Sequence, residues 1–260
     1  MRIRLSLIPA TDESATVPVN YQYPLSAAIY GILREAAPAY ADFLHQKGYR
    51  SPDGRLMKLF TFSKLWIPDV RIRGTALTGS AKPWRLSIGS PFQEEFVQNV
   101  VRGLFFRRRL TLAGNGLRAD FDIAQIKVIP RPEFSSRMAF KCLSPVVVST
   151  MHEHRGKLHT HYLPPDAPEF SELIRKNLLQ KYQIIHGRPP EDPSLHFRVK
   201  SGGKIRSRLI SIKPGTAQET RIRAFETYFL LEGNPELMAT AWDCGIGEHN
   251  SQGFGMIDPL

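Results

Sequence analysis

An eleven-residue segment near the C-terminus has a glycine spacing suited to phosphate binding. It reads GIGEHNSQGFG over residues 245–255, with two Gly-hydrophobe-Gly units directly behind an apolar, helix-like stretch. Glycine reaches backbone angles closed to other residues, and clustered peptide N–H groups bind phosphate oxygens. A tight turn between a helix and a strand would also use a pair of glycines. The candidate binding residues are Gly245, Gly247, Gly253, Gly255 and His249, although His249 could instead line the turn.

A second candidate surface is basic. Between His196 and Arg223 there are eight Lys or Arg residues and one acid, Glu219. A three-residue hairpin loop at 201–203 would place Lys200 opposite Lys204, Arg198 opposite Arg206 and His196 opposite Arg208. Like charges in register cost stability that a phosphate backbone would relieve, so we expect a ribbon that grips a nucleic acid. The alternative is a solvated edge strand protected against aggregation.

Composition supports a polyanionic partner. The 260 residues include 35 Lys or Arg and 24 Asp or Glu, which gives a net charge of +11. A membrane surface would also suit this charge, but no apolar run approaches the length of a spanning helix and no signal-peptide core is present. We therefore expect a cytoplasmic protein without membrane contact. Cys142 and Cys244 stand alone in apolar settings, which favours buried thiols over a disulfide or a zinc site.

The glycine pattern resembles the C-terminal G-h-G-x-x-x-x-x-G-h-G loop of the RAMP superfamily of CRISPR-associated RNA-binding proteins. The ending Ser251-Gln252-Gly253-Phe254-Gly255 is similar to that of the repeat-processing endoribonucleases in this superfamily. Two further stretches support the resemblance, residues 20–30 and residues 43–63. The resemblance implies an active site made of a Tyr on the first helix, a later His and a Lys entering the next strand. These map onto Tyr30, His45 and Lys58.

Cleavage of RNA without a metal needs a base for the 2′-hydroxyl, an acid for the departing 5′-oxygen, and donors to the phosphate. As hypotheses, His45 transfers protons, Tyr30 assists that transfer or orients the substrate, and Lys58 stabilises phosphate charge. Each residue also has a purely structural interpretation. His45 could be a cation at a helix C-terminus, Tyr30 a half-buried core residue and Lys58 a solvated lysine at a strand edge.

A histidine-rich segment is the candidate metal site. With Gly156 and Lys157 as a two-residue turn, His154 would face His159 and His152 would face His161 on one side of a hairpin. Such a cluster could hold Zn²⁺ or Ni²⁺, and the alternative is an exposed polar hairpin. We expect no metal and no cofactor, because the resemblance requires none at this position.

The elements that must position these residues fall into two similar halves. In the first, Ile3, Leu5 and Leu7 alternate as a strand, and a helix from Pro24 carries an apolar stripe that includes Ile29. A short helix to His45, strands at 59–62 and 84–88, a helix at 92–104 and a closing hairpin at 110–129 follow. The break falls at Pro130-Arg131-Pro132.

The second half repeats this order. We expect strands at 138–148, 197–199, 209–212, 222–231 and 254–257, and helices at 170–179 and from Asn234 to Gly245. The predicted fold is α+β, with tandem ferredoxin-like (βαββαβ) domains over residues 1–130 and 137–260 and a C-terminal glycine-rich loop. The RAMP resemblance implies the same topology.

The resulting expectation is a metal-independent endoribonuclease that binds CRISPR repeat RNA and cuts precursor transcripts into guide RNAs. The alternative is a non-catalytic RNA-binding subunit of a CRISPR ribonucleoprotein. Other subunits of such a complex are further possible partners, and the protein itself would be a monomer or a homodimer. A basic membrane-surface protein is disfavoured, because the sequence has no basic amphipathic helix.

Overall fold

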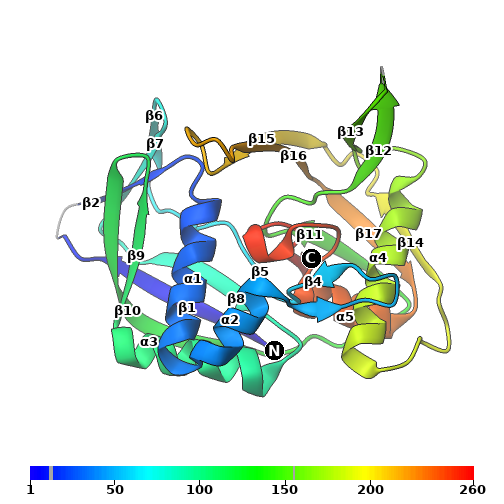
Figure 1. Cartoon of the computed structure of the whole chain (residues 1–260), viewed down its shortest axis with the longest axis horizontal. Helices are drawn as coiled ribbons and strands as arrows, with labels where there is room; N and C mark the ends of the chain where they lie inside the picture. The colour runs from blue at the N-terminus through cyan, green and yellow to red at the C-terminus, as the bar shows by residue number, and fades with distance from the viewer. Residues whose placement is uncertain (12–13, 155) are drawn as a thin grey trace.

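The computed structural model describes residues 1–11, 14–154 and 156–260. Two main β-sheets lie side by side, and helices cover one face of each (Figure 1). The glycine-rich segment lies between them near the centre of the molecule, drawn in red.

The first sheet has five antiparallel strands in the order β5-β8-β1-β10-β9. These strands are Thr61–Phe62, Trp84–Gly89, Arg2–Pro9, Leu117–Ile129 and Arg109–Gly114. Its helices are α1 (Gln22–Ala36), α2 (Pro38–Gln46) and α3 (Asn99–Arg107), the last preceded by a π-helical turn, η1 (Gln93–Gln98).

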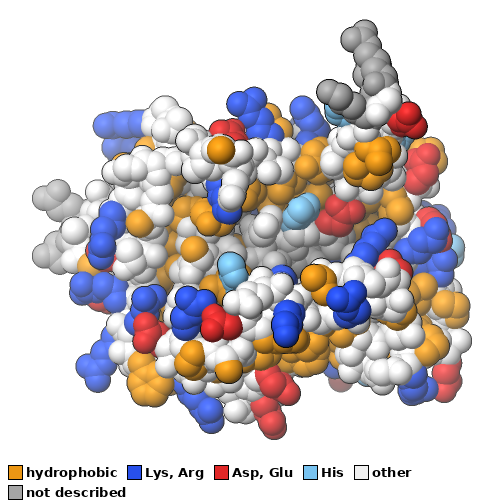
Figure 2. All heavy atoms as spheres, viewed as in Figure 1, with side chains coloured by type: hydrophobic (Ala, Val, Ile, Leu, Met, Phe, Trp, Pro, Cys, Tyr) orange, Lys and Arg blue, Asp and Glu red, His pale blue; other side chains and the backbone are white. Residues whose placement is uncertain are grey.

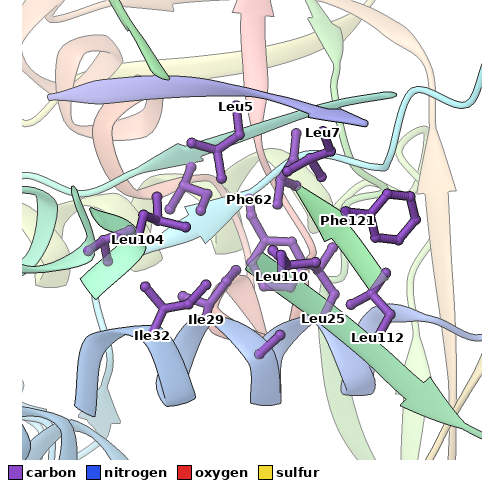
Figure 3. Close-up of a cluster of buried hydrophobic side chains, with 14 of the residues drawn as sticks. Leu5, Leu7, Leu25, Ile29, Ile32, Phe62, Leu104, Leu110, Leu112 and Phe121 are labelled. Carbon is purple, nitrogen blue, oxygen red and sulfur yellow. The ribbon is translucent and has the colours of Figure 1, made fainter. Parts of the chain in front are cut away.

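The core of this half forms where α1 packs under the sheet (Figure 3). Ile3, Leu5 and Leu7 are at most 1% exposed, as their alternation predicts, because every second side chain of a strand points to the same face. Leu25 and Ile29 rise from α1 to meet them. This packing holds α1 in a fixed position, with its opposite side free to carry functional residues.

The second sheet has four strands in the order β14-β17-β11-β18, which are Leu195–Val199, Tyr228–Gly233, Arg137–Cys142 and Ile257–Pro259. Helices α4 (Phe170–His186) and α5 (Pro235–Cys244) cover it. Counted along the chain, both sheets have the order 2-3-1-4, with β9 added at one edge of the first. The predicted tandem ferredoxin-like fold is therefore confirmed.

Accessory strands form smaller sheets around these two. One sheet consists of β2 (Ser14–Pro18), β7 (Ala76–Ser80) and β6 (Arg71–Arg73), and the pairs are β3 (Tyr49–Arg50) with β4 (Leu56–Met57), β12 (Ser149–His154) with β13 (Lys157–Tyr162), and β15 (Arg206–Ile212) with β16 (Thr220–Glu226).

The predicted hairpin across residues 196–208 is wrong. Strand β14 pairs with β17 in the second sheet, whereas β15 turns away and pairs with β16. Burial decides this pairing, because Phe197 stacks on Phe229 of β17 with ring centroids 4.6 Å apart. Ile210 and Ile222 instead join a separate small core with Phe254. The cross-strand pairs of like charge that we expected do not exist.

Other strand boundaries also differ from the prediction. The segment predicted as one strand over 222–231 breaks at Thr227, because its two parts pair with different partners. Strand β11 ends at Cys142, well before the predicted Val148, since only a single bridge at Val146 follows. The last strand begins at Ile257, because residues 253–256 remain in the glycine-rich loop.

The first two residues bind the two halves together. The N-terminal amine lies 3.1 Å from Asp243 Oδ1, and Arg2 donates to Asp258, to the Trp242 carbonyl and to the Ile257 carbonyl. Burial lowers the pKa of Arg2 to about 10, so the guanidinium stays charged at neutral pH. These contacts hold α5 and β18 against β1, and the loop between α5 and β18 therefore faces the first half.

Within the described residues, none of the helices has both the length and the apolar character that crossing a bilayer requires.

Candidate active site

The glycine-rich loop, residues 245–255, is a folded turn on the protein surface. It leaves α5 at Gly245, contains a short 3-10 turn, η2 (Asn250–Gln252), and leads to β18. A side chain at Gly255 would place its Cβ 2.0 Å from the Ile246 carbonyl oxygen, and one at Gly253 would lie 2.6 Å from the Phe62 ring. Both glycines also have positive φ, so both are required for the conformation itself.

The four glycines of this loop are buried, and its more accessible part runs from Glu248 to Gln252. The glycines thus shape the loop, while Ile246 and Phe254 are buried and the stretch from Glu248 to Gln252 is partly exposed. His249 is the exposed member, in a left-handed conformation with φ 57°. Partial desolvation lowers the pKa of its imidazole, and the nearby Glu248 carboxylate opposes that shift.

Lys181, a buried lysine that the sequence analysis did not identify, binds the glycine-rich loop from the side that faces the protein interior. Lys181 of α4 donates from Nζ to the Gly245 carbonyl at 2.8 Å, the Gly247 carbonyl at 3.1 Å and Asn250 Oδ1 at 2.7 Å. The residue is 2% exposed, and its desolvation lowers the pKa to about 8. The sequence does carry one indication of this role, because Lys181 lies on the apolar stripe of α4, one turn after Leu178, where a lysine is unusual.

The loop also contacts the first domain. Ser26 Oγ of α1 donates to the Ser251 carbonyl at 2.7 Å, and Thr61 Oγ1 of β5 donates to the Phe254 carbonyl at 3.1 Å. The loop therefore spans from the second domain to α1, and anything that binds on its surface also meets side chains of α1.

Tyr30 and His45 meet beside this contact. Their rings pack edge to face with centroids 5.6 Å apart, Tyr30 on α1 and His45 in the last turn of α2. Burial raises the pKa of the Tyr30 hydroxyl to about 12, and the neighbouring Ser251 side chain of the loop opposes that shift. Tyr30 therefore stays protonated near neutral pH and acts as a hydrogen-bond donor or acceptor. The His45 side chain is exposed, which suits a group that exchanges protons with a bound molecule.

Lys58 completes the predicted group. Its Nζ donates to the His45 carbonyl at 3.1 Å, and partial burial lowers its pKa. The preceding segment, which contains β3 and β4, reaches the second domain, where Gln180 Nε2 donates to Asp53 Oδ2 at 2.6 Å.

A pocket of about 410 Å³ opens between the Lys58 segment and the glycine-rich loop, lined by residues 55–59 and 247–252 together with Asn177 and Lys181. Figure 2 shows this face hollowed near its centre, with histidine and basic side chains around the hollow. The three predicted catalytic residues and the loop are thus brought to one place from segments far apart in sequence. The arrangement can supply a proton carrier, a neutral phenol and an ammonium group to a bound phosphodiester.

The basic residues of the second domain lie elsewhere. Arg198 and Arg208 pair with carboxylates, at 2.9 Å to Glu232 and 3.8 Å to Glu226. Lys200 is exposed at the end of β14, and Lys204 and Arg206 line a separate pocket with Lys64 and Lys141. The structure therefore does not bring the predicted basic ribbon to the loop.

The histidine-rich hairpin forms with a different register from the one predicted. His152 lies opposite His159, and His161 lies opposite Thr150, because the turn falls one residue earlier in the chain. His152 and His161 still approach each other diagonally, with ring centroids 4.9 Å apart. Across the described residues there is no group of three or more His, Cys, Asp or Glu side chains able to hold a metal ion. Arg155, which precedes the predicted Gly156-Lys157 turn, lies outside the described residues.

Comparisons with known proteins cover the whole chain. A family model for the N-terminal part of the CRISPR-associated protein Cas6 matches residues 16–127, and a model for its C-terminal part matches residues 129–259. A CRISPR-associated endoribonuclease Cas6 of Methanocaldococcus jannaschii is 34% identical over 99% of this chain and 92% of its own. The corresponding Pyrococcus furiosus enzyme is 29% identical over 99% of this chain and 89% of its own.

A solved structure described as CRISPR associated protein Cas6 has the same fold. It is 33% identical to this chain, superposes with a TM-score of 0.80, and the match covers 100% of this chain and 99% of the other.

Proposed function

Because the chain belongs to the Cas6 family of CRISPR-associated proteins, we propose that it is an endoribonuclease that cleaves CRISPR precursor transcripts within their repeats. The relatives named as endoribonucleases support RNA cleavage in general. The finer proposal is that cleavage needs no metal, proceeds by attack of a 2′-hydroxyl and yields guide RNAs in the cytoplasm.

The observation that carries this proposal is the convergence of Tyr30, His45 and Lys58 on the glycine-rich loop. Ser251 of the loop contacts Tyr30, Tyr30 packs on His45, and Lys58 binds the His45 carbonyl. An exposed imidazole, a partly buried phenol and an ammonium group can together supply the proton transfer and the hydrogen-bond donors that phosphodiester transesterification requires.

In the proposed reaction the 2′-oxygen bonds to the adjacent phosphorus and the bond from phosphorus to the 5′-oxygen breaks. The products are a 2′,3′-cyclic phosphate and a 5′-hydroxyl. His45 moves the proton lost by the 2′-hydroxyl or gained by the 5′-oxygen, Tyr30 orients the ribose-phosphate by hydrogen bonding, and Lys58 balances the charge that grows on the phosphate.

RNA binding would divide between the two domains. We propose that the domain of residues 1–130 carries the catalytic side chains, and that the domain of residues 137–260 presents the glycine-rich loop, with His249 toward the RNA. The basic residues Arg198, Lys200, Lys204, Arg206 and Arg208 would bind phosphates at a distance from the cut. CRISPR repeat RNA is the proposed partner, and other subunits of an effector complex could hold the product.

One assay tests the proposal. Repeat RNA from the host's own CRISPR array, incubated with the protein and excess chelator, should be cut once within the repeat. A single 2′-deoxy nucleotide on the 5′ side of the cut should abolish cleavage without abolishing binding. RNA that is bound but never cut would instead identify a non-catalytic RNA-binding subunit, and cleavage of the 2′-deoxy substrate would contradict the proposed chemistry.

A further inference from the structure

A second pocket lies at the N-terminal end of α1, away from the candidate catalytic residues. It has a volume of about 520 Å³ and is lined by three segments, residues 18–24, 113–115 and 213–218. The last of these is the turn between β15 and β16, which Figure 1 shows close to the start of α1. Asn20 Oδ1 accepts from the Ser211 N–H at 3.3 Å and joins that hairpin to the first domain.

The lining of this pocket suits a flat, partly polar group. Tyr23 is 38% exposed, and prolines supply further apolar surface. Asn20, Asn115 and Gln218 add side-chain amides, which can both donate and accept hydrogen bonds. Bases of single-stranded RNA are recognised in this way, by stacking on an aromatic ring and by hydrogen bonds to the base edges.

The pocket also carries a positive charge, the Lys213 ammonium group, and no carboxylate among the described residues contacts it. Lys213 Nζ lies 5.5 Å from the centre of the Tyr23 ring and donates to Gln218 Oε1, and neither contact neutralises the ammonium group. The nearby carboxylate of Glu219 is already engaged by the Gly215 N–H and by Arg221. A phosphate that accompanies a bound base would therefore meet the Lys213 ammonium group at the rim of the pocket.

Helix geometry connects this pocket to the candidate active site. Tyr23 and Tyr30 are seven residues apart, so they lie on the same face of α1, separated by two turns or about 10 Å. Ser26 lies between them on that face and donates to Ser251 of the glycine-rich loop. A short stretch of single strand that runs along this face would reach both Tyr23 and the Tyr30–His45 pair.

We propose that the pocket formed by Tyr23, Lys213 and the neighbouring amides binds one unpaired base of the substrate RNA, a few nucleotides from the cleaved bond. The proposal rests on the proposed function, because it assigns a position within the same bound strand. Tyr23 supplies the stacking surface, Lys213 binds the phosphate of that nucleotide, and the amides of Asn20 and Gln218 face the base edge. By holding one base at a fixed place along α1, the pocket helps to set the register of the cut.

The test combines protein variants with abasic substitutions. Dissociation constants are measured for repeat RNA made uncleavable by one 2′-deoxy nucleotide, intact and with single abasic sites placed in turn near the cut. In the wild type, one position should weaken binding about tenfold when its base is removed. Tyr23→Ala should weaken binding of the intact RNA by the same factor, and the abasic site at that position should then cost nothing further.

Tyr23→Phe keeps the ring and should behave as wild type, and Phe106→Ala is a matched control because Phe106 is an exposed aromatic residue on α3, 72% accessible. Lys213→Ala should weaken binding of both intact and abasic RNA. The proposal is overturned if Tyr23→Ala binds intact RNA as tightly as wild type. It is also overturned if every abasic site weakens binding of Tyr23→Ala as much as it weakens binding of the wild type. Wild-type cleavage of unmodified repeat RNA is measured in parallel. If the wild type neither binds nor cuts it, the proposed function fails as well, whereas normal cleavage with an unaffected Tyr23→Ala removes only the pocket.

Discussion

The two ferredoxin-like domains share one strand order but hold their parts of the candidate site in different ways. The first domain presents Tyr30, His45 and Lys58 on accessible or half-buried surfaces, where few contacts hold each side chain. The second domain presents a loop with four buried glycines, fixed by a fully buried lysine. If the proposed roles hold, the comparison indicates that the proton-transferring groups are exposed to solvent, whereas the loop proposed to align the substrate is held rigidly.

The largest expected effect belongs to the reactive half. His45→Ala should slow single-turnover cleavage by about a thousandfold, because general acid–base catalysis contributes factors of this order. Affinity for repeat RNA should stay within a few-fold of wild type, since the imidazole is exposed and packs against the edge of the partly buried Tyr30 ring. Cleavage rates and dissociation constants measured together check this. His186→Ala, at another exposed histidine in the last turn of a helix, is the matched control, and full activity of His45→Ala would remove His45 from the mechanism.

The rigid half is tested at Lys181. Lys181→Met should reduce the single-turnover rate about a hundredfold, because small displacements of an aligning surface cost factors of this size. Lys176→Met on the exposed side of α4 is the control, since the Lys176 side chain is 63% exposed.

Asn250→Ala removes one of the three acceptors of Lys181 and also the bonds from Asn250 Nδ2 to the Ile246 and Phe254 carbonyls, so it should give a loss of similar size. Combined with Lys181→Met it should add little, because both variants break one hydrogen-bonded unit. Strictly additive losses, or a Lys181→Met protein with the wild-type rate, would show that the loop does not depend on this clamp.

The burial of Lys181 should also make the free energy of unfolding depend on pH. Burial lowers the pKa of Lys181 from 10.5 to about 8, so between these values the unfolded chain binds a proton that the folded chain does not. The free energy of unfolding therefore rises with pH in this window, and the destabilisation is complete below pH 8 and absent above 10.5. Relative to Lys181→Met, the wild type should gain roughly 3 kcal/mol across it. Urea unfolding over a pH series measures the difference, and parallel curves for the two proteins would contradict the assignment.

The smallest effect is expected from the basic residues outside the site. Replacing Lys200, Lys204 and Arg206 by Ala should lower the magnitude of the slope of log affinity against log salt by about 2. The variant makes fewer phosphate contacts, so its binding to RNA releases fewer counterions. Replacing Arg198 and Arg208 should change the slope less, since both already pair with glutamates. Fluorescence titrations at several salt concentrations compare the two variants. Identical slopes for the triple variant and the wild type would exclude these residues from RNA binding.

Much of the fold followed from local patterns. The alternation of Ile3, Leu5 and Leu7 produced a buried strand, and Asn234 caps α5 by accepting from the Glu236 N–H at 2.8 Å. The errors arose where segments compete for partners. Local sequence allows β14 and β15 to pair with each other as a hairpin. Instead β14 pairs with β17 and β15 pairs with β16, because each strand buries its apolar side chains in that pairing. The predicted register of the histidine-rich hairpin was wrong for a related reason, since the strands of this hairpin are mostly exposed and burial constrains their pairing little.

The sequence alone determined the ferredoxin-like pattern, the glycine-rich loop and the candidate residues Tyr30, His45 and Lys58, because each depends on short-range spacing or on a resemblance carried by contiguous residues. Only the tertiary structure decided that the loop rests on Lys181, that α1 carries both Tyr23 of the second pocket and Tyr30 beside the loop, and that the basic strands separate. These features depend on hydrogen bonds and apolar contacts between segments far apart in the chain. Their energies exist only after the segments have come together, so local sequence does not reveal them.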